Sequence, residues 1–215
     1  MSLKTTLIIA RHGNTFEPEQ TPTRVGAHTD LPLTEGGRQQ GRRLARAMED
    51  EGIIPDVVYA ARLKRSYQTA QEAVAAMPVE PAILTEEIFD EIDYGPDENK
   101  TEDEVVARIG QSAIDQWNQK AIVPEGWQVS PEGIIGNWQE FADKICRDYP
   151  GGAVLVVTSN GIARFAPHLT GDFDKFASDH EIKLSTGAYA IFETSEDEDL
   201  WTLQKWNVKP GQQTI

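Results

Sequence analysis

Arg11, His12 and Gly13 are the residues of this sequence whose types and spacing could do chemistry on a phosphoryl group. They follow an apolar, β-branched run at residues 7–10, which predicts a buried strand that ends where the charges begin. Ligands of open α/β sheets bind at the carboxyl ends of the strands. An arginine fork can hold two phosphoryl oxygens, and a neutral imidazole beside it can attack phosphorus. The alternative is a solvated arginine and a locally satisfied histidine, and these three residues alone do not decide.

Two later strand ends carry further charged groups. Residues 56–60 are predicted to form a strand, and Arg65 lies in the first turn of the helix that follows, up to about residue 77. The amino end of a helix is already partly positive, so a basic side chain there indicates a bound anion, with a solvated surface as the alternative. A third predicted strand, 83–89, leads into an acidic stretch that we expect to be mostly solvated. One of its carboxyls, if desolvated beside like charges, could act as a general acid.

Charge and composition exclude several classes of partner. The chain has 20 Lys and Arg against 35 Asp and Glu, a net charge of −15, which argues against nucleic acid and anionic membranes as partners. The single cysteine, Cys146, cannot form an internal disulfide, so we expect a cytoplasmic location. No membrane-spanning stretch or signal peptide is recognisable. One cysteine and four histidines give no zinc-type spacing, so neither a metal nor a cofactor is expected. The oligomeric state stays open.

The order of the predicted elements indicates the fold class. Thr34 is the expected N-cap of the first helix. Helices are predicted over residues 35–50, 101–121, 131–147 and 160–165, and strands over 153–157, 182–192 and 200–206. Interleaved strands and helices favour an α/β fold, a three-layer α/β/α sandwich with a mostly parallel central sheet. We expect a single domain over residues 1–215, with residues 96–150 as a helical, cap-like insert over the site.

Four segments, in this order, resemble the histidine phosphatase superfamily, the phosphoglycerate mutase-like proteins. Residues 11–13 resemble its R-H-G signature, and residues 30–37 its D-x-P-L-T-x-x-G segment. Residues 63–70 resemble its L-x-R-x-x-Q-T-A segment, and residues 91–95 its E-x-x-x-G segment. The order and spacing agree from about residue 7 to residue 192, which makes the combination far more specific than the tripeptide alone.

The resemblance implies a role for each matching residue. His12 would be the phosphoryl-accepting nucleophile and Glu91 the proton donor. Arg11 and Arg65 would bind the phosphoryl oxygens. The family needs no metal for this chemistry, and the implied partner is a small phosphorylated substrate.

Two positions depart from the family pattern. Where the family has S-H-G after the strand at 153–157, this chain has Ser159 in the place of the histidine, followed by Asn160. We expect both to contact phosphate at the start of the next helix. Loss of one group from a transition-state clamp typically costs about 10² to 10³ in rate, so this replacement bears on activity. Mutase members carry an asparagine where this chain has Pro18, which favours a phosphatase over a mutase.

The sequence therefore predicts a metal-independent phosphomonoester phosphatase, a phosphoric monoester hydrolase acting through a phosphohistidine intermediate. The alternative is a non-catalytic or weakly active phosphoglycerate mutase-like module that binds a phosphorylated ligand or a protein partner. Substrate identity is expected to depend on the insert and on the loop after the signature. The candidate contacts of that loop are Asn14, Thr15, Arg24, Gly26 and His28. His28 could supply charge missing at Ser159 or lie on the surface.

Overall fold

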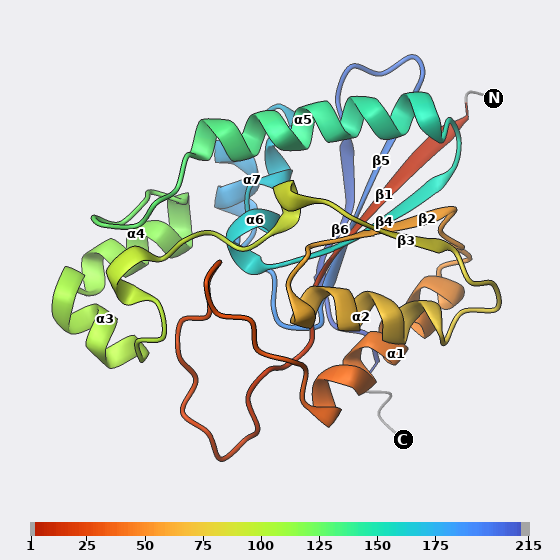
Figure 1. Cartoon of the computed structure of the whole chain (residues 1–215). Coiled ribbons are helices and arrows are strands. Elements are labelled where there is room, and N and C mark those ends of the chain that lie inside the picture. Colours follow the sequence, from red (N-terminus) through yellow and green to blue (C-terminus); the bar gives the residue numbers. More distant parts are fainter. Residues whose placement is uncertain (1–2, 212–215) are drawn as a thin grey trace.

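A mixed sheet of six strands lies between two layers of helices in the computed structural model, which describes residues 3–211 (Figure 1). The strands are β1 (Lys4–Arg11), β2 (Val57–Ala60), β3 (Ala82–Thr85), β4 (Ala153–Thr158), β5 (Tyr189–Ser195) and β6 (Thr202–Val208). Their order in the sheet is β3-β2-β4-β1-β5-β6. The first four strands run parallel to one another, β5 pairs antiparallel with β1, and β6 pairs antiparallel with β5. The predicted α/β sandwich is confirmed; residues 1–2 and 212–215 of the predicted domain lie outside the described chain.

The helices cover both faces of this sheet (Figure 1). They are α1 (Glu35–Asp50), α2 (Lys64–Val74), α3 (Glu102–Ile109), α4 (Gln111–Lys120), α5 (Pro131–Asp148), α6 (Asn160–Ala163) and α7 (Phe173–Asp179). α1 and α2 lie on one face, and α5 lies across the other. Within residues 3–211, no helix is both long and apolar enough to cross a membrane.

The alternation of side chains along β1 explains why both faces need a cover. Leu7 and Ile9 belong to the core shared with α5, whereas Ile8 and Ala10 belong to the core shared with α1 and α2. All four side chains are fully buried. A strand that is buried on both faces reads as a continuous apolar run, which is why this segment could be recognised in the sequence.

Three predicted elements are shorter than expected. The strand predicted at 83–89 ends at Thr85 and is followed by a 3-10 turn. The strand predicted at 182–192 begins only at Tyr189, because residues 182–188 form an irregular segment. The helix predicted at 160–165 has four residues, Asn160–Ala163, and a 3-10 turn follows it.

The helix predicted over 101–121 is two helices. Gly110 adopts a φ of 82°, a conformation that L side chains rarely adopt, and it separates α3 from α4. The apolar spacing continues across this break, so periodicity alone could not reveal it. Sequence reasoning also missed α7 altogether.

The sheet places its two central strand ends side by side. Arg11, the last residue of β1, is opposite Thr158, the last residue of β4. The His12 amide donates a hydrogen bond to the Thr158 carbonyl oxygen at 2.9 Å. The residues that follow β1 and β4, including Ser159, therefore leave the sheet together at its carboxyl edge.

Candidate active site

A cavity of about 600 Å³ opens at the carboxyl ends of β1 and β4, next to the loop of residues 13–33 and the end of α4. Of the predicted catalytic and phosphate-binding residues, Arg11, His12 and Asn160 line it. Arg65, Glu91 and Ser159 are buried and are not among its lining residues. The chain thus gathers at one sheet edge groups that are far apart in the sequence.

The ring of His12 is oriented by its own neighbour. Nδ1 lies 2.8 Å from the Gly13 carbonyl oxygen, and since a carbonyl only accepts, Nδ1 carries the proton of the neutral ring. Nε2 then keeps its lone pair. Burial, together with the charges of Arg65 and Arg11, holds the pKa of His12 well below its usual range. A neutral imidazole with a free lone pair is the form that a nucleophile needs.

Close backbone contacts fix the turn after His12. A Cβ on Gly13 would lie 2.4 Å from the Gly37 carbonyl oxygen, and one on Gly37 would lie 2.3 Å from that of Asn14. Both positions therefore need glycine, which accounts physically for the glycines of the first two motif segments. The Gly13 amide donates to Thr69 Oγ1 at 2.9 Å.

Thr69 connects this turn to α2. Its hydroxyl donates to the Arg65 carbonyl oxygen at 2.7 Å while accepting from Gly13. The neighbouring Gln68 accepts from the Leu33 amide at 2.9 Å. Two side chains of the Q-T-A segment, Gln68 and Thr69, thus hold the two ends of the site loop in place.

The two predicted phosphate-binding arginines make their hydrogen bonds to neutral oxygens. Arg11 Nη1 donates to the Leu184 carbonyl oxygen at 3.0 Å. Arg65, which is fully buried, donates to the carbonyl oxygens of Thr29 at 2.7 Å and Gly26 at 3.2 Å. The Nε of each arginine is buried and has no partner among the described residues. Two guanidinium charges that contact only carbonyls leave positive charge available for an anion.

Glu91 lies in the same buried layer. Oε1 accepts from the Ile92 amide at 3.0 Å, and the Tyr94 hydroxyl lies 3.5 Å from Oε2. Burial raises the pKa of Glu91, although the positive charges of Arg65 and Arg11 oppose the rise. A carboxyl with a raised pKa can hold a proton and donate it to a leaving group.

Ser159 and Asn160 differ in what they offer a ligand. Ser159 is fully buried, and its hydroxyl has no hydrogen-bond partner in residues 3–211. The Asn160 side chain accepts from the Leu184 amide at 3.0 Å, which gives it a structural task besides lining the cavity. Because α6 has only four residues, its dipole is weaker than the predicted longer helix would supply.

The candidate loop residues divide into two groups. Asn14, Thr15 and Arg24 line the cavity, and so does Pro18. Gly26 and His28 do not line it. His28 is exposed, and its Nε2 lies 3.1 Å from Asp93 Oδ2 on the surface.

Glu98 fixes the second half of this loop. Its Oε1 accepts from the amides of Gly26 and His28, both at 3.1 Å, and from the Thr29 hydroxyl at 2.7 Å. We expected most of the acidic stretch to be a solvated face, and Glu98 is one of the members that are instead half-buried and hydrogen-bonded. The signal available was only a carboxylate among many carboxylates, which does not single out Glu98.

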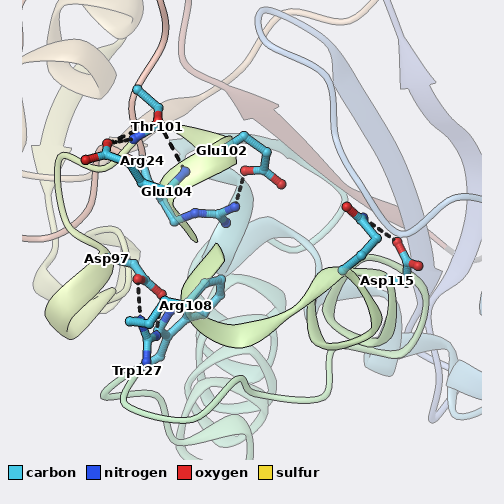
Figure 2. Close-up of polar contacts among 9 residues, drawn as sticks. Arg24, Asp97, Thr101, Glu102, Glu104, Arg108, Asp115 and Trp127 are labelled. Carbon is cyan, nitrogen blue, oxygen red and sulfur yellow. Dashed lines mark hydrogen bonds and ion pairs between the residues drawn. The ribbon is translucent and has the colours of Figure 1, made fainter. Parts of the chain in front are cut away.

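Arg24 is held at the cavity wall by aromatic rings and by α3. Its guanidinium lies 4.9 Å from the Trp127 ring centroid and forms an ion pair with Glu102 (Figure 2). The same figure shows Asp97 accepting from Trp127 Nε1 at 2.7 Å and from Arg108 Nε at 2.6 Å. These contacts join the loop, α3 and the segment before α5 into one wall.

Sequence reasoning missed Arg164. It is buried, its guanidinium lies 3.9 Å from the Trp117 ring centroid, and it lines the cavity. Its Nη1 donates to the Trp117 carbonyl oxygen at 2.7 Å. The available signal was an arginine in an otherwise apolar segment after a central strand. Arginine is almost never fully buried unless it is paired, so its place in such a segment indicates a specific interaction.

Comparisons with known proteins agree with this geometry. The sequence matches the model of the histidine phosphatase superfamily (branch 1) over residues 7–209. The chain belongs to this superfamily. Members of the superfamily are phosphatases or mutases, so the chain is an enzyme of the phosphoryl-transfer kind.

Two relatives and one solved structure illustrate the similarity. The phosphoglycerate mutase-like protein 4 of Arabidopsis thaliana is 25% identical over 203 residues, 93% of this chain and 84% of the relative. A 2,3-bisphosphoglycerate-dependent phosphoglycerate mutase of Leifsonia xyli is 27% identical over 176 residues, 80% of this chain and 68% of the relative. The fold matches a mycobacterial glucosyl-3-phosphoglycerate phosphatase with a TM-score of 0.77, at 17% identity, covering 95% of this chain and 99% of that one.

Proposed function

We propose that the protein is a metal-independent phosphatase that hydrolyses a small phosphomonoester through a phosphohistidine at His12. The observation that carries the proposal is the state of the His12 ring. Its Nδ1 proton is engaged by the Gly13 carbonyl oxygen at 2.8 Å, and burial beside Arg65 and Arg11 lowers its pKa. Nε2 therefore presents a lone pair where two guanidinium groups can hold a phosphoryl group.

The chemistry takes two steps in which Glu91 gives up and regains one proton. In the first, His12 Nε2 forms a bond to phosphorus while the ester P–O bond breaks, and the leaving alkoxide takes the Glu91 proton. In the second, water attacks phosphorus, Glu91 accepts a proton from that water, and the P–N bond breaks. Phosphate leaves, and His12 and Glu91 return to their starting forms. Arg11 and Arg65 stabilise the negative charge on the phosphoryl oxygens in both steps.

Ser159 favours the rival proposal, a weakly active or inactive module that binds a phosphorylated ligand or a protein partner. The buried hydroxyl can donate one neutral hydrogen bond, whereas an imidazolium at this position could add a charge. We favour the enzyme because Glu91, which simple anion binding does not require, is buried beside the arginines with a raised pKa.

The proposal is tested by trapping the intermediate. The wild-type protein is mixed with ³²P-labelled phosphomonoesters, quenched rapidly in alkali, and assayed for label that is stable in base and lost in acid. His12→Ala should carry no label and release no phosphate, whereas His180→Ala, which changes an exposed histidine, should behave as the wild type. Phosphate release at an undiminished rate by folded His12→Ala would refute the mechanism. Binding of phosphate without turnover of any ester would favour the binding module.

A further inference from the structure

Three cations beyond Arg11 line the cavity, and they differ in how their charge is balanced. They are Arg24, Arg164 and Lys183. Arg24 forms an ion pair with Glu102. Neither Arg164 nor Lys183 forms an ion pair with a carboxylate of residues 3–211. In a chain with 35 acidic residues, a buried arginine such as Arg164 with no ion-pair partner among the described residues calls for a physical explanation.

Arg164 makes its hydrogen bonds to neutral oxygens and forms no ion pair with a described residue, and the nearby Glu91, when ionised, opposes the effect of burial by raising the pKa of Arg164. Its guanidinium donates to the carbonyl oxygens of Trp117 at 2.7 Å and Asn160 at 3.3 Å and lies on the Trp117 ring. Burial lowers the pKa of Arg164 to about 10, so the group is still charged at neutral pH. A buried charge without a counter-ion is costly to maintain. An anion in the cavity would offset that cost.

Lys183 adds a second charge at the mouth of the same cavity. It precedes Leu184, whose carbonyl oxygen accepts from Arg11, so its place is fixed relative to the phosphoryl-binding residues. Lys183 is an exposed residue, and partial desolvation and the charges of Arg11 and Arg164 lower its pKa. That change in pKa is opposed by the charges of two acidic residues, Glu181 and Glu102. The positive charges of Arg11, Arg164 and Lys183 repel one another when the cavity holds no anion.

The cavity is larger than one phosphoryl group needs. Arg11 and His12 line one part of its wall, and the volume of about 600 Å³ lies within the range of whole small-molecule sites. Its lining also includes Trp117 and Thr186. A substrate bound by its phosphoryl group at His12 would thus extend past further side chains, among which Arg164 and Lys183 carry the unbalanced charge.

We propose that Arg164 and Lys183 form a second anion subsite, which binds a carboxylate or a second phosphate on the part of the substrate remote from the transferred phosphoryl group. The inference rests on the proposed function, since it assumes that the phosphoryl group occupies the His12 pocket. It defines the substrate class as phosphomonoesters that carry a second negative group. The Arg164 guanidinium recognises paired oxygens through its planar fork, and Lys183 contributes a more mobile point charge.

The test compares substrates that differ only in the remote group. Glycerol 1-phosphate and 3-phosphoglycerate differ by a hydroxymethyl group against a carboxylate, and glycerol 1,3-bisphosphate offers a phosphate instead. Glucitol 6-phosphate and 6-phosphogluconate repeat the comparison over a six-carbon chain, which covers a longer reach. We expect kcat/KM to be at least tenfold higher for the doubly anionic member of one pair. Preference for the carboxylate or for the bisphosphate identifies which anion the subsite takes.

Variants then connect the preference to the subsite. Lys183→Met should reduce the preference ratio at least fivefold, and Lys183→Glu should abolish it. Arg164→Lys, which retains charge but loses the fork, should reduce it as well. Lys120→Met is the matched control, because it removes an exposed charge that does not line the cavity and should leave the ratio unchanged. An equal loss of activity on both members of a pair in the Arg164 and Lys183 variants would assign these residues to the phosphoryl pocket and overturn the proposal.

A chain that is not a phosphatase can be told apart from a chain that lacks the second anion subsite. If no phosphomonoester is turned over, calorimetric titration of the same pairs onto wild type and Lys183→Met still tests the subsite. Tighter binding of 3-phosphoglycerate or 6-phosphogluconate by the wild type alone supports it. Equal affinities for neutral and anionic members, or a preference that survives Lys183→Glu, refute it.

Discussion

The Glu91 carboxylate lies so close to Gly161 that a Cβ added to the glycine would be 2.2 Å from Oε1. Only glycine fits there without moving the carboxyl or the backbone after β4. The same Cβ would lie 2.8 Å from Ile92 Cγ1, so the neighbouring side chain leaves no room either. The turn that follows β4 thus determines where the predicted proton donor can lie.

Gly161→Ala should therefore impair proton donation. We expect kcat for an alkyl phosphate to fall by about 10²-fold, the lower range for general acid catalysis, because Glu91 is displaced from the leaving oxygen. An aryl phosphate, whose leaving group needs less protonation, should be affected less. Steady-state kinetics on both esters measure the difference.

Gly136→Ala is the control for this substitution. Gly136 lies in α5 and has nothing within 4 Å of an added Cβ. Replacing a helical glycine by alanine should stabilise the protein by about 0.5 to 1 kcal/mol and leave both rates unchanged. Equal rates for Gly161→Ala and wild type on the alkyl ester would contradict the role given to Glu91.

The pH dependence of activity should report two shifted groups. Burial holds the pKa of His12 below its usual range and raises that of Glu91. Because catalysis needs neutral His12 and protonated Glu91, kcat/KM should rise as His12 loses its proton and fall at higher pH as Glu91 loses its own. In Glu91→Gln the fall should disappear, so the ratio of wild type to variant should decrease as pH rises. A ratio that is constant with pH would exclude Glu91 as the acid. The ionisation of the substrate cancels in this ratio.

The stability of the protein should change with pH through the same carboxyl. A raised folded-state pKa means that stability is fully present below the unfolded-state pKa and is lost as pH rises through the folded-state value. Glutamine has no proton to lose. The free energy of unfolding of Glu91→Gln minus that of the wild type should therefore increase with pH, as measured by urea unfolding at a series of pH values. A difference that decreases with pH would show that Glu91 is favoured in its ionised form.

Ser159 should matter for activity more than for stability. Its hydroxyl has no partner among the described residues, so Ser159→Ala removes no internal hydrogen bond and should change the melting temperature little. If the hydroxyl donates to a bound phosphoryl group, kcat/KM should fall by about tenfold or more. Ser159→His should raise kcat/KM toward a small phosphomonoester by at least about tenfold, if the folded protein accommodates the ring. Unchanged activity in folded protein of both variants would favour the binding module.

Activity should survive chelators. Arginines supply the positive charge that magnesium supplies in many phosphoryl-transfer sites. We expect the same kcat/KM before and after dialysis against EDTA. Loss of activity that magnesium restores would contradict the metal-independent mechanism.

The sheet could be predicted because its central strands are buried on both faces. The centres of β1 and β4 are continuous apolar runs, and the charged residue that ends β1, Arg11, marked the strand end. Thr34 was recognisable as an N-cap, and it accepts from the Gly37 amide at 3.0 Å. Such signals are local, so a single sequence suffices to find them.

The charged wall of the cavity could not be predicted in the same way. Lys183 was assigned to a strand, whereas it lies in an irregular segment that brings it to the cavity mouth. To predict the place of Arg164 in the cavity wall, one would have to know that the chain after α6 brings its guanidinium onto the Trp117 ring. Glu98 fixes the substrate loop through backbone amides far away in the sequence. Each of these contacts is set by tertiary packing, which leaves no periodic pattern in the sequence.

The unbalanced cations of the cavity also bear on the kinetics of substrate encounter. An anionic substrate approaches a molecule of net charge −15 and is repelled at long range, while Arg11, Arg164 and Lys183 attract it near the mouth. At physiological ionic strength the Debye length is about 8 Å, which screens the distant carboxylates more than the cations that the substrate finally touches. Moderate salt should therefore speed association, in contrast to enzymes whose whole surface attracts the substrate.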